Sequence, residues 1–588
     1  MPTRPLPDDP SLEHLRKQAK RLRKAVQEGN PAAVREVEEF HPRRKPATTR
    51  FALTDAQLVT ARSYGFASWA TLTRHLADIT PLIWNPPPAP DPGSNVDVFV
   101  RLVCLTYAGW HRSNPMRALR MLAADPGLAR ASIYSAAAAG DVEEVRRRLD
   151  RDPSLVNAKG GPLRWEPLLY ACYSRLPSTS EEHPTLDVVR LLLARSADPN
   201  AGFLFSGRYA FTALTGAFGR GEDWANQPPH PECDALARLL LDAGADPNDA
   251  QALYNRHFQQ NDDHLRLLFA YGLGRDKGGP WLKRLNEESS SPARLLVQQL
   301  CWAAMHGFSE RVKLLVERGV DVNTPSLRDG RTAYEEALRA GHQATAEYLL
   351  RHGAKKTELD PLETFALACI AGRRDEARAR LAEDPSLLDR MGHHGRVELL
   401  HRALDARQPA GIRLIVELGV DIDAMVPGTG LDRTALHNAA GWGGLEMVKL
   451  LLDLGASPTL RDPTYHAAPI GWAMHNQQRD VIEYLLQFAD IFGAVPCDGV
   501  ERVARLLHKD PSLSNARDDD GDPLVFYLHP EMTRLEETIQ LLVSHGADIN
   551  ARGRDGRTLV DRALARGWIE FADLVRGYGG RPAAELAD

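Results

Sequence analysis

Acidic residues and histidines recur in three neighbouring segments of the sequence, and these residue types could do chemistry. The segments hold Glu181, Glu182 and His183, then Glu222, Asp223 and His230, then His257, Asp262, Asp263 and His264. Carboxylates and imidazoles gathered at one edge can bind a metal ion or act as general acid and base. They show no fixed ligand spacing such as His-Glu-x-x-His, however, and acidic loop residues are usually solvated. We therefore expect solvated loops with no metal, no cofactor and no catalytic residue, and an enzyme is the alternative.

Aromatic residues are concentrated in the same part of the chain. Residues 165–224 hold nine of them, about twice the density of the whole sequence. They are Trp165, Tyr170, Tyr173, Phe203, Phe205, Tyr209, Phe211, Phe218 and Trp224. Aromatic side chains dominate binding hot spots, but they also pack loops against a core. Both interpretations stay open at this point.

Composition favours a large protein of a reducing compartment, with no sign of a membrane segment. The chain has 588 residues and a net charge of −6, so it is too long for one core and gives no global signal for a nucleic-acid partner. Its six cysteines are scattered singly, as in a reducing compartment. The first ten residues lack the apolar run of a signal peptide, and no apolar stretch is long enough to cross a bilayer. We expect a cytoplasmic protein with no membrane contact.

The elements that position these side chains are repeated helix pairs. A leucine-rich run followed by a Gly/Asp/Asn cluster recurs, for example at 239–248, 314–323, 450–458 and 541–550. The leucines form one helical stripe, the glycine ends the helix in a left-handed conformation, and Asp or Asn closes the turn. A shorter alanine-rich helix precedes these runs, so each unit is a helix–turn–helix.

The clearest of the short helices is Arg433-Thr434-Ala435-Leu436-His437-Asn438-Ala439-Ala440. It resembles the Thr-Pro-Leu-His-x-Ala signature of the ankyrin repeat, a unit of about 33 residues. Looser copies cover most of 131–580. The resemblance implies an all-α solenoid of about a dozen units. It also implies a protein partner bound by the turn tips and first helices on a concave face, with no shared catalytic residues.

Alignment of each unit to the best copy gives candidate partner-binding residues. These are Trp165, Tyr173, Tyr209, Phe211, Trp224, Trp442 and His475. We expect Trp165 and Tyr173 to face solvent, with Leu168 and Ala171 between them in the core. The favoured partner site is the concave surface around 160–270. The alternative is a small-ligand pocket or active site roofed by two inserted loops, 174–185 and 220–232.

The predicted domain order is simple. Residues 1–80 form a helical module, 81–95 a proline-rich linker, 96–273 a first arm, 274–291 a break and 292–588 a second arm. The first helix crowds six cations together, Arg16, Lys17, Lys20, Arg21, Arg23 and Lys24. A solvated polar face explains them best, because no aromatic platform or nucleic-acid motif accompanies them. Contact with phosphates or an acidic partner is the alternative.

Overall fold

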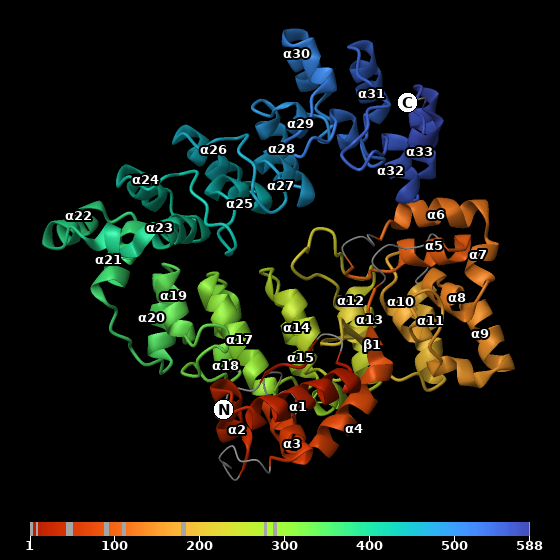
Figure 1. Ribbon diagram of the computed structural model, residues 1–588, viewed down its shortest axis with the longest axis vertical. Coiled ribbons are helices and arrows are strands. Elements are labelled where there is room, and N and C mark those ends of the chain that lie inside the picture. Colours follow the sequence, from red (N-terminus) through yellow and green to blue (C-terminus); the bar gives the residue numbers. More distant parts are fainter. Residues whose placement is uncertain are drawn as a thin grey trace. The chain divides into compact units, whose positions relative to one another are not determined.

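The computed structural model describes residues 4–7, 10–42, 51–86, 93–108, 113–177, 184–275, 279–285 and 291–586. The chain divides into two compact units. Unit 1 comprises Met1–Leu300 and Lys313–Gly330, and unit 2 comprises Cys301–Val312 and Arg331–Asp588. Within each unit, short helix pairs follow one another along the chain (Figure 1). The predicted all-α helical stack is confirmed.

Unit 1 begins with a four-helix module and continues as an array of helix pairs. The module consists of α1 (Leu12–Gln27), α2 (Pro31–Phe40), α3 (Leu53–Ser63) and α4 (Trp69–Ile79), followed by η1 (Thr80–Leu82) and β1 (Ile83–Trp84). The array contains α5 (Asn95–Val103), α6 (Pro115–Ala124), α7 (Gly127–Arg130), α8 (Ile133–Ala139), α9 (Val142–Arg151), η2 (Pro153–Asn157), α10 (Pro167–Cys172), α11 (Pro184–Ala194), β2 (Gly202–Phe205), β3 (Tyr209–Thr212), α12 (Ala213–Phe218), α13 (Cys233–Asp242), α14 (Ala250–His257), α15 (Asp263–Ala270) and α16 (Pro280–Leu285).

The division between the units passes through α17 (Pro292–Met305) and α18 (Ser309–Glu317). Unit 2 continues with α19 (Ala333–Arg339), α20 (Gln343–Arg351), α21 (Pro361–Ile370), α22 (Arg374–Glu383), α23 (Leu387–Asp405), α24 (Pro409–Glu417), α25 (Ala435–Trp442), α26 (Leu445–Asp453), α27 (Pro469–His475), α28 (Arg479–Leu486), α29 (Ile491–Ala494), α30 (Val500–Lys509), η4 (Pro511–Asn515), η5 (Leu524–Tyr527), α31 (Leu535–Ser544), α32 (Leu559–Ala565), α33 (Ile569–Gly577) and η6 (Ala583–Glu585). Helix α23 is interrupted at Gly392, where φ is 63° and ψ is −174°. The predicted break at 274–291 stays a prediction, and 276–278 and 286–290 lie outside the described residues.

The best repeat shows why its sequence folds as it does. Thr434 caps α25, and its hydroxyl donates to Nδ1 of His437 at 2.7 Å. Nε2 of His437 donates to the carbonyl oxygen of Ala467 at 3.0 Å, which ties one unit to the turn of the next. Gly443 ends the helix at φ 75°, a left-handed conformation that glycine adopts without strain. The helix start and end signals of this repeat and its contact with the next repeat therefore favour the same structure.

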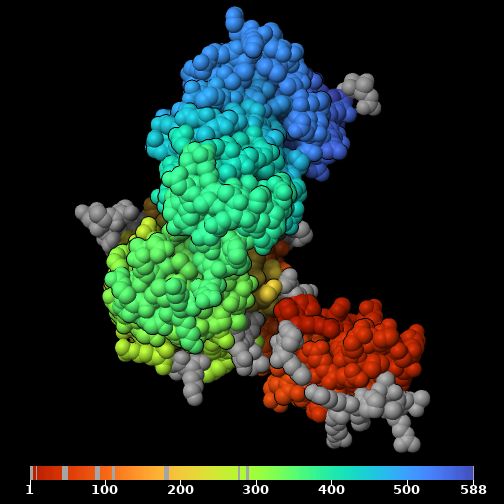
Figure 2. All heavy atoms as spheres, turned by 90° about the vertical axis from the view of Figure 1, so that its left-hand side faces the viewer, coloured from red at the N-terminus to blue at the C-terminus, as the bar shows by residue number. Residues whose placement is uncertain are grey.

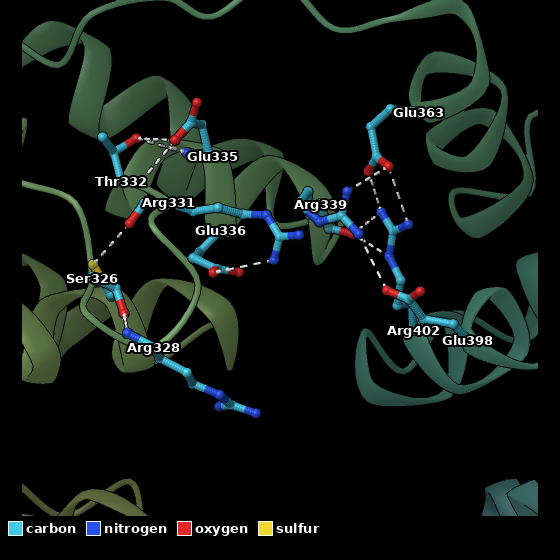
Figure 3. A network of polar contacts seen from close by, with 11 residues as sticks. Ser326, Arg328, Arg331, Thr332, Glu335, Glu336, Arg339, Glu363, Glu398 and Arg402 are labelled. Atoms are coloured by element: carbon cyan, nitrogen blue, oxygen red, sulfur yellow. Dashed lines mark hydrogen bonds and ion pairs between the residues drawn. The ribbon is translucent and has the colours of Figure 1, made fainter. Parts of the chain in front are cut away.

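A charged network also links successive helices of unit 2 (Figure 3). Glu363 on α21 accepts hydrogen bonds from Arg339 on α19 at 2.7 Å and from Arg402 on α23 at 2.5 Å. Arg402 also donates to the carbonyl oxygen of Arg339 at 2.9 Å, and Arg339 reaches Glu398 at 3.2 Å. Burial lowers the pKa of Arg402 although Glu363 opposes that shift. Helices α19, α21 and α23 are thus joined by polar contacts as well as by packing.

Unit 1 contains a three-stranded sheet that the sequence did not reveal. Strand β1 lies within the predicted linker and pairs parallel with β2, with Trp84 opposite Phe205. Strand β2 pairs antiparallel with β3. Leu204 of β2 packs in one cluster with Leu15 and Leu72 of the N-terminal module. The module is therefore joined to the array by strand pairing and by an apolar contact.

The aromatic residues around 165–224 form a core under this sheet. Trp165 is 1% exposed and stacks on Phe203, with ring centroids 4.7 Å apart. Trp84 lies 5.4 Å from Trp165, and Tyr173, fully buried, lies 5.0 Å from it. The expected solvent exposure of Trp165 and Tyr173 is wrong, because the hairpin and β1 cover them. Phe211, 5% exposed, is buried in the same cluster.

This packing predicts that Trp165→Ala and Tyr209→Ala differ strongly in their effect on stability. Trp165→Ala should lower the free energy of unfolding of unit 1 by about 3–5 kcal/mol, since it opens a cavity in the aromatic core. Tyr209→Ala should cost no more than about 0.5 kcal/mol, because the Tyr209 side chain is 48% exposed. Urea unfolding followed by circular dichroism measures both. A loss for Trp165→Ala as small as that expected for Tyr209→Ala would show that Trp165 is not a core residue.

Candidate functional site

Two exposed aromatic side chains of unit 2 come from the neighbouring helices α25 and α27 and the turn between them. Trp442, at the end of α25, is 49% exposed, and Tyr465, in the turn before α27, is 70% exposed. Trp472 of α27 lies 5.6 Å from Tyr465 in a T-shaped contact. We call Arg433, Trp442, Tyr465, Trp472 and His475 the Trp442 surface. Its members come from two adjacent helices and their preceding turns.

A buried carboxylate fixes the geometry of this surface. Asp462 accepts a hydrogen bond from the indole Nε1 of Trp472 at 3.0 Å and from the backbone amide of Tyr465 at 2.6 Å. Burial alone would raise the pKa of Asp462, but these bonds and those from other backbone amides outweigh it and lower that pKa. Asp462 therefore stays ionised near neutral pH, and it holds the turn that presents Tyr465.

Close packing positions the remaining members. The Arg433 guanidinium lies 4.7 Å from the centroid of the Trp472 ring. Trp472 lies against Gly441, where a Cβ atom would approach it to 3.6 Å. His475, at the end of α27, is exposed. The sequence alignment found Trp442 and His475 but missed the other three.

Unit 1 presents a smaller exposed group. Tyr209 is 48% and Tyr254 is 39% exposed, and the hydroxyl of Tyr254 donates to the Glu222 carboxylate. Burial, with the Glu222 charge, raises the pKa of Tyr254. Trp224 is half-buried, and its carbonyl oxygen accepts a bond from Arg220 at 3.0 Å. We call Tyr209, Glu222 and Tyr254 the Tyr254 surface.

The second inserted loop is anchored to the stack by a buried arginine. Arg175, 4% exposed, donates to the carbonyl oxygens of Pro228 at 2.7 Å, Gly216 at 2.9 Å and Ser174 at 2.8 Å. Burial lowers the pKa of Arg175. A guanidinium bonded to several backbone carbonyls fixes the loop against the helices. Of the first inserted loop, residues 178–183 lie outside the described residues.

Among the described residues, the candidate histidines and carboxylates do not form one cluster. His230, His257 and His264 are buried, and His264 packs 6.2 Å from Phe218. Glu222 bonds Tyr254 instead, and Glu181, Glu182 and His183 lie outside the described residues. Within the part of the chain that is described, no group of three His, Cys, Asp or Glu residues could hold a metal ion. Nor does any described helix combine the length and apolar character needed to cross a bilayer.

Comparison with known proteins supports the repeat assignment. Residues 296–360 and 400–494 match the family model of ankyrin repeats, in three copies. The chain is 27% identical over 242 residues to "Ankyrin repeat and SAM domain-containing protein 6" of Danio rerio, covering 38% of this chain and 30% of that protein. It is 26% identical over 190 residues to "Rabankyrin-5" of Mus musculus, covering 28% and 16%. It is 23% identical over 379 residues to "E3 ubiquitin-protein ligase KEG" of Arabidopsis thaliana, covering 58% and 20%.

The stacked helix pairs and these matches define a class of repeat protein. The chain contains ankyrin repeats at residues 296–360 and 400–494, and it is similar over part of its length to ankyrin-repeat proteins. The matched region spans less than a third of the length of each of these relatives. Ankyrin repeats in general serve protein–protein interaction, and the Trp442 surface lies within the matched residues 400–494.

The buried His230 predicts a pH dependence of stability. Its Nδ1 accepts from the amide of Glu232 at 3.0 Å, and Nε2 contacts the Thr185 hydroxyl at 3.1 Å. Burial, together with the Arg175 charge, lowers its pKa to about 3. The stability that neutral His230 contributes is present above pH 6.5 and is lost as the pH falls toward 3.

Between pH 7 and pH 5, the wild type should therefore lose about 2 kcal/mol relative to His230→Gln, which keeps a neutral amide at that position. Urea unfolding of both proteins at the two pH values gives the difference. Parallel pH dependences would mean that His230 is not held neutral by the fold.

Proposed function

We propose that the chain binds a protein partner and that the Trp442 surface is the centre of the contact. The observation that carries the proposal is the exposure of Trp442 and Tyr465, since Tyr209 and Tyr254 are the only other exposed Phe, Tyr or Trp side chains among the described residues. Tryptophan and tyrosine are enriched in binding hot spots, because they bury a large area with little loss of rotamer freedom. The turn held by Asp462 supports this proposal, since an ordered turn reduces the entropy lost on binding.

The partner chemistry follows from the groups present. The Trp442 surface offers the faces and edges of three aromatic rings with one guanidinium, and it lacks a continuous charged stripe. We infer that the partner contacts Trp442 and Tyr465 with apolar or aromatic side chains. The Tyr254 surface is a second contact in the proposed 160–270 region, where Tyr209 and Tyr254 remain available and Trp165, Tyr173 and Phe211 do not.

A matched pair of variants tests the proposal. Trp442→Ala/Tyr465→Ala should weaken partner binding by about 30-fold or more, because a hot spot contributes at least about 2 kcal/mol. Its stability should change little, since both side chains are exposed. The partner is first captured from native lysate with the wild-type chain, and its affinity is then measured by titration with each variant.

The control is Met116→Ala/Ile569→Ala, which removes two exposed apolar side chains, 60% and 51% exposed, from other parts of the chain. It should bind like the wild type. Equal weakening in both variants would assign the effect to general loss of apolar surface. Unchanged binding after removal of Trp442 and Tyr465 would place the contact elsewhere.

A further inference from the structure

Helix α1 presents a polar face that is separate from both aromatic surfaces. Its apolar stripe, with Leu15, Ala19 and Leu22, is buried, and α1 packs chiefly on α3. Because that stripe is covered, only the opposite half of the helix is available to a partner. The N-terminal module that carries α1 is the red body in Figure 2.

The cations on this face are mostly not neutralised. Arg16, Lys20, Arg21 and Arg23 are exposed. Within the part of the chain that the structure describes, none of these four forms an ion pair with a carboxylate. Ion pairs are found only for the other two cations of the helix.

Those two pairs are weak. Lys17 lies 2.7 Å from Glu13, and Lys24 lies 3.7 Å from Glu28. In both pairs each side chain is more than half exposed, so the attraction is screened by water and salt. The helix therefore keeps a concentrated positive charge in a chain whose net charge is negative.

Helical spacing arranges these charges in a row. Positions 16, 20 and 23 are separated by four and three residues, so Arg16, Lys20 and Arg23 lie on one side of α1. At a rise of about 1.5 Å per residue the row is about 10 Å long. Lys17 and Lys24 lie beside it. A linear array of this kind can contact several charges of an extended polyanion at once.

A groove of mixed charge lies between α1 and α2. It has a volume of about 430 Å³, and Arg4, Arg21 and Arg35 line it together with Glu36 and Glu39. Arg4 pairs with Glu36 at 3.1 Å. Arg21 and Arg35 remain without an ion pair among the described residues. The groove thus holds guanidinium groups and carboxylates together, on another side of α1 from the row, and the positive charge is concentrated on the row itself.

We propose that this face of α1 binds the phosphate backbone of a nucleic-acid duplex. Unpaired Lys and Arg side chains supply the sequence-independent part of such binding by releasing counterions from the phosphates. The argument for a nucleic-acid duplex is charge complementarity. The lack of exposed large apolar side chains argues against a folded protein and against a bilayer. Among the described residues of α1–α4 no large apolar side chain is exposed, so the face lacks a hot spot for a folded protein and an anchor for a bilayer.

The same observation selects against a single strand. Single-strand binding relies on aromatic side chains that stack on successive bases, and helix α1 has no Phe, Tyr or Trp for such a platform. A duplex presents its phosphates outward in regular rows and needs no stacking platform. This proposal does not rest on a protein partner at the Trp442 surface.

Salt-dependent binding of the full chain to a fluorescent 20-base-pair DNA duplex tests the proposal. Fluorescence anisotropy between 50 and 200 mM NaCl gives the slope of log affinity against log salt. Each phosphate contact contributes about 0.9 to the magnitude of that slope. Arg16→Gln/Lys20→Gln/Arg23→Gln should therefore reduce it by about 2.7 and weaken binding at least tenfold at 50 mM NaCl.

The control variant, Arg146→Gln/Arg151→Gln/Arg190→Gln, removes the same charge from exposed arginines of α9 and α11. It should keep the wild-type slope, and both variants should keep the wild-type circular dichroism spectrum. Lys20→Gln alone should reduce the slope by about 0.9. Three results would overturn the proposal: no duplex binding at 50 mM NaCl, equal losses in the two triple variants, or tighter binding to polyglutamate or to phosphatidylserine vesicles than to the duplex.

Discussion

The covering of each helix pair by its neighbours is the constraint on which the rest of this structure depends. Helices α25 and α26 have eight and nine residues, fewer than the roughly 12–15 that an isolated helix needs in water. Their buried residues Leu436 and Leu451 belong to a core cluster whose members extend from Phe365 to Val575. Because stability arises at each junction, side chains that face away from the junctions can vary without loss of the fold.

In unit 1, a strand as well as neighbouring helices covers the repeats. Strand β1 brings Trp84 over Trp165 and Phe203, so aromatic rings that would be exposed in a bare repeat become core. Leu204 and Trp281 then pack with residues of the N-terminal module. The aromatic density of this region therefore reflects the attachment of an additional module. Because most of the aromatic residues in this region are covered, the few that remain exposed are candidates for a binding surface.

The fold was predictable because its signals are local and repeated. The cap at Thr434, the left-handed Gly443 and the leucines of α26 are each readable in one unit and recur in others. The burial of Trp165 and Tyr173 was not predictable, since it depends on β1, about 80 residues away, in a segment that appeared to be a linker. At the candidate site, Trp442 and His475 followed from alignment. Tyr465 and Trp472 did not, although Trp472 occupies the position of Asn438 in the preceding repeat.

The two proposed contacts of this chain rest on different physics. The Trp442 surface removes apolar area from water, and that free energy changes little with ionic strength at physiological concentrations. The proposed contact of α1 acts through unpaired charges at the protein surface, where salt screens attraction beyond about 8–10 Å. Salt concentration should therefore change the affinity of the contact at α1 and leave the affinity at the Trp442 surface nearly constant. A chain with both can hold a protein partner while its attachment to a polyanion responds to the ionic conditions, and no conformational change needs to pass between the two sites.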